Sequence, residues 1–160
     1  MFNIFKKNCK KLLIKAPVDG DIVDIVEVPD EVFAQKLVGD GVAVNPKSDI
    51  FVSPVNGVIT TVFPTKHAIG IKTLDGIEIM IHVGVDTVKL NGEGFTTFIN
   101  EGDKVKIGDK LLQINMTIVK SKAKSLISPI IITNMGKIKE YKKIIGKATA
   151  GKTDIIEAVI

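Results

Sequence analysis

The chain has 160 residues, of which 45% are hydrophobic, and this suits one globular domain with a sizeable core. Its formal net charge of +4 comes entirely from lysine, and the absence of arginine argues against nucleic-acid binding, which relies on arginine for paired contacts to bases and phosphates. The single cysteine, Cys9, excludes an internal disulfide bond and a zinc cluster of cysteines.

Residues 1–15 differ in character from the rest of the chain. Hydrophobic side chains recur there at helical spacing between lysines, at Phe2, Phe5, Cys9 and Leu12. This pattern is typical of a basic amphipathic helix that makes weak contact with an anionic membrane surface. Because so short a helix is marginal in water, a disordered tail leading into a first strand at residues 12–14 is the alternative. No apolar run is long enough to span a membrane and no signal peptide is recognisable, so we expect a cytoplasmic protein.

Residues 16–160 are expected to form one β domain, because short apolar segments alternate there with Gly, Pro, Asn and Asp. One motif occurs as APVDGDIV at 16–23 and again as SPVNGVIT at 53–60, with a weaker copy, SPIII, at 128–132. The first two copies each combine a proline, a tight turn and a strand. Their 37-residue offset indicates a pseudo-symmetric unit with equivalent turns in its two halves, and coincidence is the alternative for so short a match.

Helical structure is expected in only two places. Residues 32–38, between Asp30 and Gly39, are predicted to form one short helical turn that Asp30 caps. Residues 117–124 are the other candidate. Residues 101–112 interleave apolar side chains with lysines and glycines, which predicts a pair of strands. The expected fold class is therefore all-β, an antiparallel sandwich or partly closed barrel with at most short helical turns.

The only two histidines, His67 and His82, both lie in alternating patterns. In residues 77–86 the odd positions form an unbroken apolar face, so His82 lies on the opposite face. Residues 61–71 place His67 on one face in the same way. The two patterns predict a site where a hydroxyl, two imidazoles and a carboxylate converge, formed by Phe63, Thr65, His67, Met80, His82, Gly84 and Asp86.

Several kinds of chemistry can be set aside for this site. The His-Val-Gly-Val-Asp spacing at 82–86 is similar to that of lysostaphin-like zinc endopeptidases, but these need a further His-x-His pair and only His67 remains. Residues 101–112 are similar to a run in biotinyl and lipoyl carrier domains, without the setting of their modified lysine. No P-loop and no activated serine motif occurs.

Histidine as a nucleophile is the remaining possibility. A neutral imidazole offers a lone pair near pH 7 and can accept and then release a phosphoryl group. Such a carrier needs a second donor for the phosphoryl oxygens and an apolar rim that excludes water. His67 and Thr65 supply donors, and nearby apolar residues supply the rim. The alternative for His82 is an ordinary exposed histidine on a strand.

Motifs along nearly the whole chain resemble the glucose-family enzyme IIA of the bacterial phosphoenolpyruvate-dependent sugar phosphotransferase system. The most specific is HVGVDTVKLNGEGF at residues 82–95. The others are APVDGDIV at 16–23, VPDEVFAQKLVGDGVAV at 28–44, PTKHAIGI at 64–71 and SPIIITNM at 128–135. The resemblance implies a fold of the barrel-sandwich hybrid type and a phosphotransferase component that works through a phosphohistidine.

The resemblance also implies a role for each site residue. His82 would accept the phosphoryl group on Nε2, the ring nitrogen farther from its backbone, and His67 would contact that group. Thr65 would orient His67, the Gly84 carbonyl would hold the other nitrogen of His82, and Asp86 would lie at the edge of the site. The implied hydrophobic docking rim comprises Val32, Phe33, Leu37, Val38, Phe63, Met80 and Val88. Met80 and Thr61 replace residues that are often Phe and Lys in relatives.

The implied partners are two proteins met in turn. The phosphocarrier protein HPr would donate the phosphoryl group, and a cysteine on the enzyme IIB domain of a sugar permease would receive it. Asp86 and the acidic segment 19–31 are candidates for meeting positive charge on them, and solvated acids in turns are the alternative for the segment. No cofactor is required, but a regulatory partner could complete a shared zinc site on His67 and His82. The sugar is not identifiable, and the chain is either a separate subunit or part of a fused permease.

Overall fold

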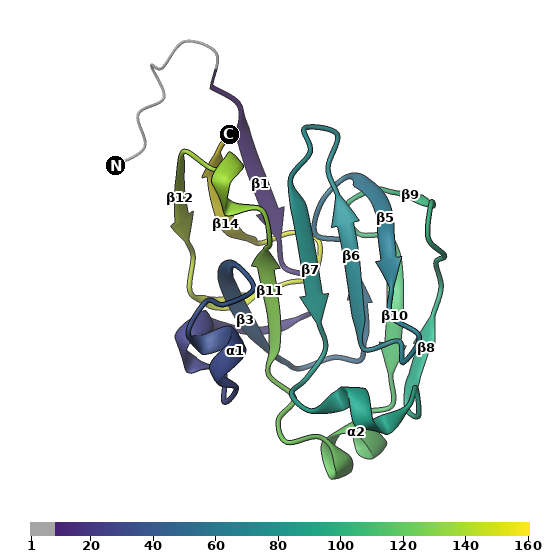
Figure 1. The fold of residues 1–160 in the computed structure, drawn as a ribbon. Coiled ribbons are helices and arrows are strands. Elements are labelled where there is room, and N and C mark those ends of the chain that lie inside the picture. Colours follow the sequence, from purple (N-terminus) through teal and green to yellow (C-terminus); the bar gives the residue numbers. More distant parts are fainter. Residues whose placement is uncertain (1–8) are drawn as a thin grey trace.

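The computed structural model of the protein describes residues 9–160 (Figure 1). Most of the proposed amphipathic helix therefore lies outside the described residues. The helical elements are η1 (Ile25–Glu27), α1 (Glu31–Ala34), η2 (Thr87–Leu90), α2 (Met116–Lys122) and η3 (Met135–Lys137). The strands are β1 (Lys11–Lys15), β2 (Gly20–Asp24), β3 (Asp40–Pro46), β4 (Ile50–Val52), β5 (Gly57–Val62), β6 (Ala68–Lys72), β7 (Glu78–His82), β8 (Phe95–Thr97), β9 (Lys104–Val105), β10 (Lys110–Ile114), β11 (Ser128–Ile132), β12 (Glu140–Lys143), β13 (Gly146–Ala148) and β14 (Asp154–Val159).

The strands form antiparallel sheets, which confirms the all-β prediction. An eight-stranded sheet has the order β13-β2-β3-β11-β7-β6-β5-β9, and two three-stranded sheets have the orders β1-β14-β12 and β4-β10-β8. The large sheet does not close into a barrel, because its outermost strands β13 and β9 are not paired with each other. Strand β7, which ends at His82, lies near the middle of this sheet between β11 and β6.

The two copies of the repeated motif occupy matching places in the large sheet. Gly20 begins β2, which pairs with β3 and β13, and Gly57 begins β5, which pairs with β6 and β9. A Cβ atom would lie 2.2 Å from the Asn45 carbonyl oxygen at Gly20, and 2.4 Å from the Lys72 carbonyl oxygen at Gly57. Both positions therefore need glycine for close strand approach. The matching pairings confirm the predicted pseudo-symmetry, whereas the weak copy at Ser128 begins a strand directly.

Alternation along the central strands separates two apolar clusters. Ile130 and Ile132 of β11 belong to the main core, and Ile131 between them belongs to a second cluster. Consecutive strand residues point to opposite faces, so the large sheet is apolar on both sides here. The second cluster contains Ile25, Val28, Phe33, Ala43, Val85 and Ile131, and Met80 packs against it. The sheet face that carries Met80 is thus covered by η1 and α1 rather than left to solvent.

Two sequence predictions about strands need correction. Residues Lys11–Lys15 form β1, which pairs with β14 from Lys11 opposite Val159 onward. This confirms the alternative of a first strand at residues 12–14, and the β domain therefore begins before Ala16. The strand pair predicted for residues 101–112 is wrong, because β9 pairs with β5 while β10 pairs with β4 and β8. Alternation indicates a strand but does not identify its partner, and of the three partners here β4 and β5 are distant in sequence.

The helical predictions are confirmed, with shifted ends. The Asp30 side chain caps α1 by accepting a hydrogen bond from the Val32 amide at 2.9 Å. This helix ends before Lys36, whose φ of 59° is not helical, and so does not reach Gly39. Asn115 caps α2 by accepting from the Ile118 amide at 3.1 Å. Among the described residues, no helix is long and apolar enough to cross a bilayer.

Candidate functional site

The two histidines meet where strands β6 and β7 lie side by side. Ala68 at the start of β6 is opposite His82 at the end of β7, and His67 immediately precedes Ala68. The Val83 amide donates to the His67 carbonyl oxygen at 2.7 Å, which ties the two segments together. The two imidazole centroids are 4.8 Å apart, with the ring planes 79° to each other. The structure therefore brings together the pair that the sequence predicted.

His67 does not lie on a strand, contrary to the predicted alternation over residues 61–71. Strand β5 ends at Val62 and β6 begins at Ala68, so His67 belongs to the loop of a hairpin. Pro64 cannot donate a backbone hydrogen bond and Lys66 has a φ of 60°, so the strand is interrupted there. Thr65 and His67 nevertheless meet, with Oγ1 of Thr65 2.6 Å from Nδ1 of His67. The Phe63 ring lies edge-on to His67, with centroids 5.4 Å apart.

His82 has one nitrogen engaged by the backbone. Its Nδ1 lies 2.8 Å from the Gly84 carbonyl oxygen, which can only accept a hydrogen bond. The hydrogen of the neutral ring is therefore on Nδ1, and the lone pair is on Nε2. The Phe33 ring packs against the imidazole, with centroids 4.9 Å apart. The expected contact between the Gly84 carbonyl and the His82 ring is present, and the role of Nε2 in phosphoryl transfer stays a prediction.

Both imidazoles are neutral near pH 7. His67 is only 3% exposed, and burial, together with the nearby His82, lowers its pKa to about 4. Burial also lowers the pKa of His82, although the hydrogen bond to Gly84 and the negative charge of Asp30 oppose this shift. A neutral His82 keeps its Nε2 lone pair available as a nucleophile.

A tightly bonded loop follows His82. The Gly84 amide donates to Oγ of Ser128 at 3.0 Å, and the Val85 amide donates to the Ser125 carbonyl oxygen at 2.9 Å. Gly84 has a φ of +73°, and a Cβ atom there would lie 2.6 Å from Cγ2 of Thr87. Only glycine fits this position. Sequence reasoning did not assign Ser125, Ser128 or Thr87 to the site. Thr87 and Ser128 fall within family-like motifs, whereas Ser125 lies outside them and gave no signal.

Asp86 does not continue the strand face of His82, as the alternating pattern predicted. The turn at Gly84 ends the alternation, and Val85 packs in the second cluster rather than with the odd-numbered residues of β7. Asp86 has a φ of 59°, is exposed, and forms an ion pair with Lys89 at 4.0 Å. It lies on the loop beside the site, and the structure does not test its role.

Most residues of the predicted docking rim are exposed. The exposed fractions are 44% for Val32, 68% for Leu37, 38% for Val38, 36% for Phe63 and 54% for Val88. Met80 is half-buried against the second cluster. Phe33 is the exception, because it is 6% exposed and belongs to that cluster. It supports His82 from below the surface, so the expectation that it is a surface residue is wrong.

Residues 9–160 contain no group of three or more His, Cys, Asp and Glu side chains placed to hold a metal ion. His67 and His82 offer two imidazole nitrogens, whereas protein zinc sites have four ligands. A metal at this site would need ligands from another molecule.

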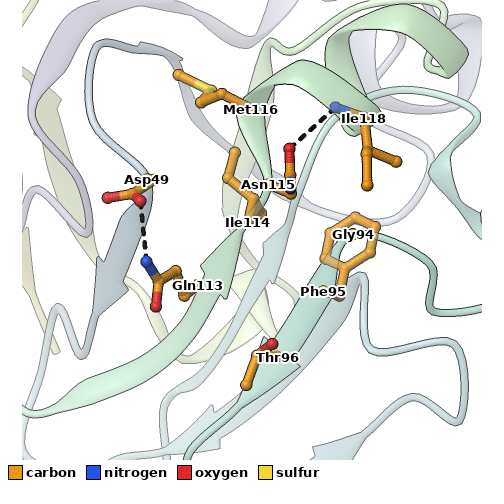
Figure 2. A pocket seen from close by; sticks show the side chains of 9 residues that line it. All are labelled: Asp49, Gly94, Phe95, Thr96, Gln113, Ile114, Asn115, Met116 and Ile118. Carbon is orange, nitrogen blue, oxygen red and sulfur yellow. Dashed lines mark hydrogen bonds between the residues drawn. The ribbon is translucent and has the colours of Figure 1, made fainter.

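A well-formed pocket lies elsewhere, between β8, β10 and α2 (Figure 2). It has a volume of about 590 Å³. Its polar side chains bond within the chain: Gln113 donates to Asp49 at 2.9 Å, and Asn115 accepts from the Ile118 amide at 3.1 Å. Neither histidine lines it. This pocket is therefore separate from the imidazole pair.

Comparison with known proteins identifies relatives over nearly the whole chain. Residues 12–138 match the family model described as phosphoenolpyruvate-dependent sugar phosphotransferase system, EIIA 1. The PTS system glucose-specific EIIA component of Halalkalibacterium halodurans is 48% identical over 145 residues, covering 90% of this chain and 84% of the relative. The protein of the same name from Buchnera aphidicola is 46% identical over 149 residues, covering 93% and 92%. The solved structure of glucose permease IIA from Mycoplasma capricolum has a TM-score of 0.87 and 43% identity, covering 97% and 99%.

Proposed function

The chain belongs to the EIIA 1 family of the phosphoenolpyruvate-dependent sugar phosphotransferase system, whose members pass phosphate from HPr to an EIIB domain, and from this premise we propose that His82 is the residue that carries the phosphoryl group. The observation that carries the proposal is the free Nε2 lone pair of a neutral His82 beside a second imidazole. The relatives are named glucose-specific, so we propose glucose as the transported sugar. We propose the cytoplasm as the compartment, in keeping with a soluble component of this system.

Acceptance is a displacement at phosphorus. The Nε2 lone pair of His82 attacks the phosphorus of phospho-HPr, and the phosphorus–nitrogen bond of the donor breaks, its electron pair returning to the donor imidazole. The new bond leaves a positive charge on the His82 ring, whose Nδ1 still holds its hydrogen. The Gly84 carbonyl oxygen, 2.8 Å away, stabilises that charge.

His67 and Thr65 support the group after it has moved. When the Thr65 hydroxyl donates to Nδ1 of His67, the hydrogen of that neutral ring is on Nε2 and can be donated to a phosphoryl oxygen. The charge of the phosphoryl group opposes the effect of burial and raises the pKa of His67 from about 4. Because a higher pKa keeps more of the His67 ring protonated, His67 becomes a stronger hydrogen-bond donor when the phosphoryl group arrives.

Onward transfer is the same displacement with a sulfur nucleophile. A cysteine thiolate of the EIIB domain attacks phosphorus, and the bond to Nε2 breaks, its electron pair returning to the ring. The ring leaves as neutral imidazole, because Nδ1 keeps its hydrogen. The exposed rim residues around the pair are proposed to exclude water from both complexes.

The direct test is to incubate the protein with phosphoenolpyruvate, the general phosphotransferase enzyme and HPr. Mass spectrometry should locate one acid-labile phosphoryl group on His82, and phosphorus NMR should show the Nε2 isomer. Addition of an EIIB domain should discharge it. Label on His67 in the native protein would reverse the proposed roles.

Zinc is proposed to bind this site only with help from a partner. Two imidazole nitrogens leave two positions of a tetrahedral site open, which a carboxylate and water can fill. The free protein should therefore bind zinc weakly in calorimetry, and phosphorylation of His82 should abolish binding because it occupies Nε2. Nanomolar binding that survives phosphorylation would show a resident metal site instead.

A further inference from the structure

We propose that Ser128 is a positioning residue for phosphoryl transfer, because its hydroxyl fixes the Gly84 carbonyl that keeps the hydrogen on Nδ1 of His82. The effect of Ser128 on the rate of transfer rests on the proposed function, whereas its effect on the Gly84 carbonyl and on the His82 tautomer does not. Ser128 begins β11, is fully buried, and lies 44 residues from Gly84 in sequence.

The peptide groups on both sides of the Gly84 α-carbon are anchored. The preceding group is held by the hydrogen bond from the Gly84 amide to Oγ of Ser128, at 3.0 Å. The following group, which contains the Gly84 carbonyl, is held by the hydrogen bond from the Val85 amide to the Ser125 carbonyl oxygen, at 2.9 Å. Glycine rotates more freely than other residues about both of its backbone torsions. The two anchors therefore set the direction of the carbonyl.

The Ser128 hydroxyl is itself held in place by two hydrogen bonds. Its hydroxyl hydrogen is donated to the Leu126 carbonyl oxygen at 2.8 Å, which directs an oxygen lone pair toward the Gly84 amide. The side chain is thus held on both sides. Removal of the hydroxyl would leave the Gly84 amide without this acceptor. The preceding peptide group would then be held only through its Val83 carbonyl oxygen, which accepts from Oγ1 of Thr87 at 2.6 Å, and could tilt about that contact.

The direction of the Gly84 carbonyl affects the chemistry through Nδ1. A carbonyl oxygen stabilises an Nδ1–H group and repels an Nδ1 lone pair, so it favours the tautomer with Nε2 free. On the phosphorylated ring it favours the protonated form in the same way. Transfer then releases neutral imidazole, which is a better leaving group than imidazolate. A displaced carbonyl should weaken both preferences.

The test compares Ser128→Ala with three other variants. Ser128→Thr keeps the hydroxyl. Ser125→Ala removes a nearby hydroxyl that accepts from the Ile127 amide, and leaves the backbone oxygen that holds Val85. Ser53→Ala removes another fully buried hydroxyl, bonded to the Val55 carbonyl oxygen in the second copy of the repeated motif. The last two control for local and for general destabilisation.

Nitrogen-15 NMR of the unphosphorylated imidazoles at about pH 8 reports the tautomer directly, above the usual pKa of histidine. The native protein should show His82 with its hydrogen on Nδ1. Ser128→Ala should lower the ratio of the Nδ1–H to the Nε2–H tautomer roughly tenfold, the size expected for losing one good hydrogen bond. Ser128→Thr should restore the native ratio, and Ser125→Ala and Ser53→Ala should keep it.

Discharge to an EIIB domain gives the second measurement. Phosphorylated Ser128→Ala should transfer roughly tenfold more slowly than the native protein at about pH 8. The two proteins should transfer equally fast at about pH 5, where solvent protonates the phosphorylated His82 ring in each of them. If Ser128→Ala does not fold, Ser128→Cys is the substitute, because its sulfur accepts hydrogen bonds only weakly. It should lower the tautomer ratio and the transfer rate in the same direction but by less.

A native tautomer ratio and pH profile in Ser128→Ala or, failing that, in Ser128→Cys, would overturn the inference, as would the same changes in Ser53→Ala. If native His82 is never phosphorylated, the proposed function fails, while the tautomer ratio still decides whether Ser128 positions Gly84.

Discussion

His82 and His67 carry the same side chain, but their hydrogen-bond partners suit them to different parts in the proposed transfer. Nδ1 of His82 faces a carbonyl, which can only accept, while Nδ1 of His67 faces a hydroxyl, which can also donate. The first arrangement prepares a nucleophile, and the second allows a donor.

Replacement of each histidine by glutamine should separate these parts. His82→Gln should abolish both acceptance and release of the phosphoryl group, because the nucleophile is lost. His67→Gln should still accept from HPr but should transfer to the EIIB domain at least tenfold more slowly, within the range for loss of one positioned donor. Quenched-flow mass spectrometry with each partner measures both steps. Equal loss of both steps in His67→Gln would contradict the division of roles.

The lowered pKa of His67 predicts how stability depends on pH. An unfolded histidine binds a proton near pH 6.5, whereas folded His67 does so only near pH 4. Between these values the unfolded state holds more protons, so stability is full above pH 6.5 and is lost as the pH falls toward 4. Urea unfolding at these two pH values should show a loss of roughly 3 kcal/mol from this residue. His67→Gln should show a correspondingly smaller loss, and an unchanged loss would assign it to carboxylates.

At the scale of elements, α1 combines a buried anchor with an exposed surface. Phe33 packs in the second cluster and against His82, while Leu37 and Val38 just after the helix are exposed. Phe33→Ser should therefore weaken partner binding and also cost roughly 3 kcal/mol of stability. It cannot serve as a clean test of docking.

Val38→Glu is the cleaner test of the rim. On the proposed function one water-excluding surface serves both partners, so the variant should weaken binding to HPr and to the EIIB domain by about tenfold each, with little change in stability. The matched control is Leu74→Glu, in the fully exposed turn at the other end of β6 and β7. Calorimetric titration with each partner measures the effect. Loss of one partner alone would show two separate docking surfaces.

The sequence predicts strands better than their pairing. Alternation marked residues 77–82 correctly, because β7 has one face toward the main core. It placed Asp86 wrongly, because no pattern of hydrophobicity shows that Gly84 adopts a positive φ and turns the chain. The strands β9 and β10 were recognisable, but their partners β5 and β4 were not, since local patterns carry no information about distant segments. Ser128 was missed for the same reason.

At the scale of the whole molecule, a polar cluster joins β12 to the end of β2 and the start of β3, between which α1 lies. Lys143 donates to Asp40 at 2.8 Å and to Asp24 at 3.1 Å, and Tyr141 donates to Asp40. Burial raises the pKa of Asp40, but the hydrogen bonds from Lys143 and Tyr141 outweigh it and hold the pKa below its usual value. The Asp40 carboxylate also raises the pKa of Tyr141 to about 12. The cluster thus fastens a three-stranded sheet to the large one.

Lys143→Met should leave the buried Asp40 carboxylate with only the more distant and half-exposed Lys36, at 3.6 Å, and lower the free energy of unfolding by roughly 2 kcal/mol. Urea unfolding at pH 7 measures this. The double variant Lys143→Met/Asp40→Asn should recover part of the loss, because the uncompensated charge is gone. The surface pair Lys122–Glu93, at 2.9 Å with both side chains half-exposed, is the comparison, and Lys122→Met there should cost less than 1 kcal/mol. Equal costs would show that Lys143 contributes no more than a surface pair.

The pairing of β1 with β14 brings the two ends of the described chain together. The Lys10 amide donates to the Ile160 carbonyl oxygen at 3.2 Å, and the Ile160 amide donates back at 2.9 Å. In Figure 1 both ends lie at the top of the molecule, whereas the arrowhead of β7, which ends at His82, points to the bottom. The described ends, at Lys10 and Ile160, therefore lie on the side of the molecule away from the imidazoles. Another protein joined at either of these two positions would leave the face that carries the imidazole pair accessible to a partner.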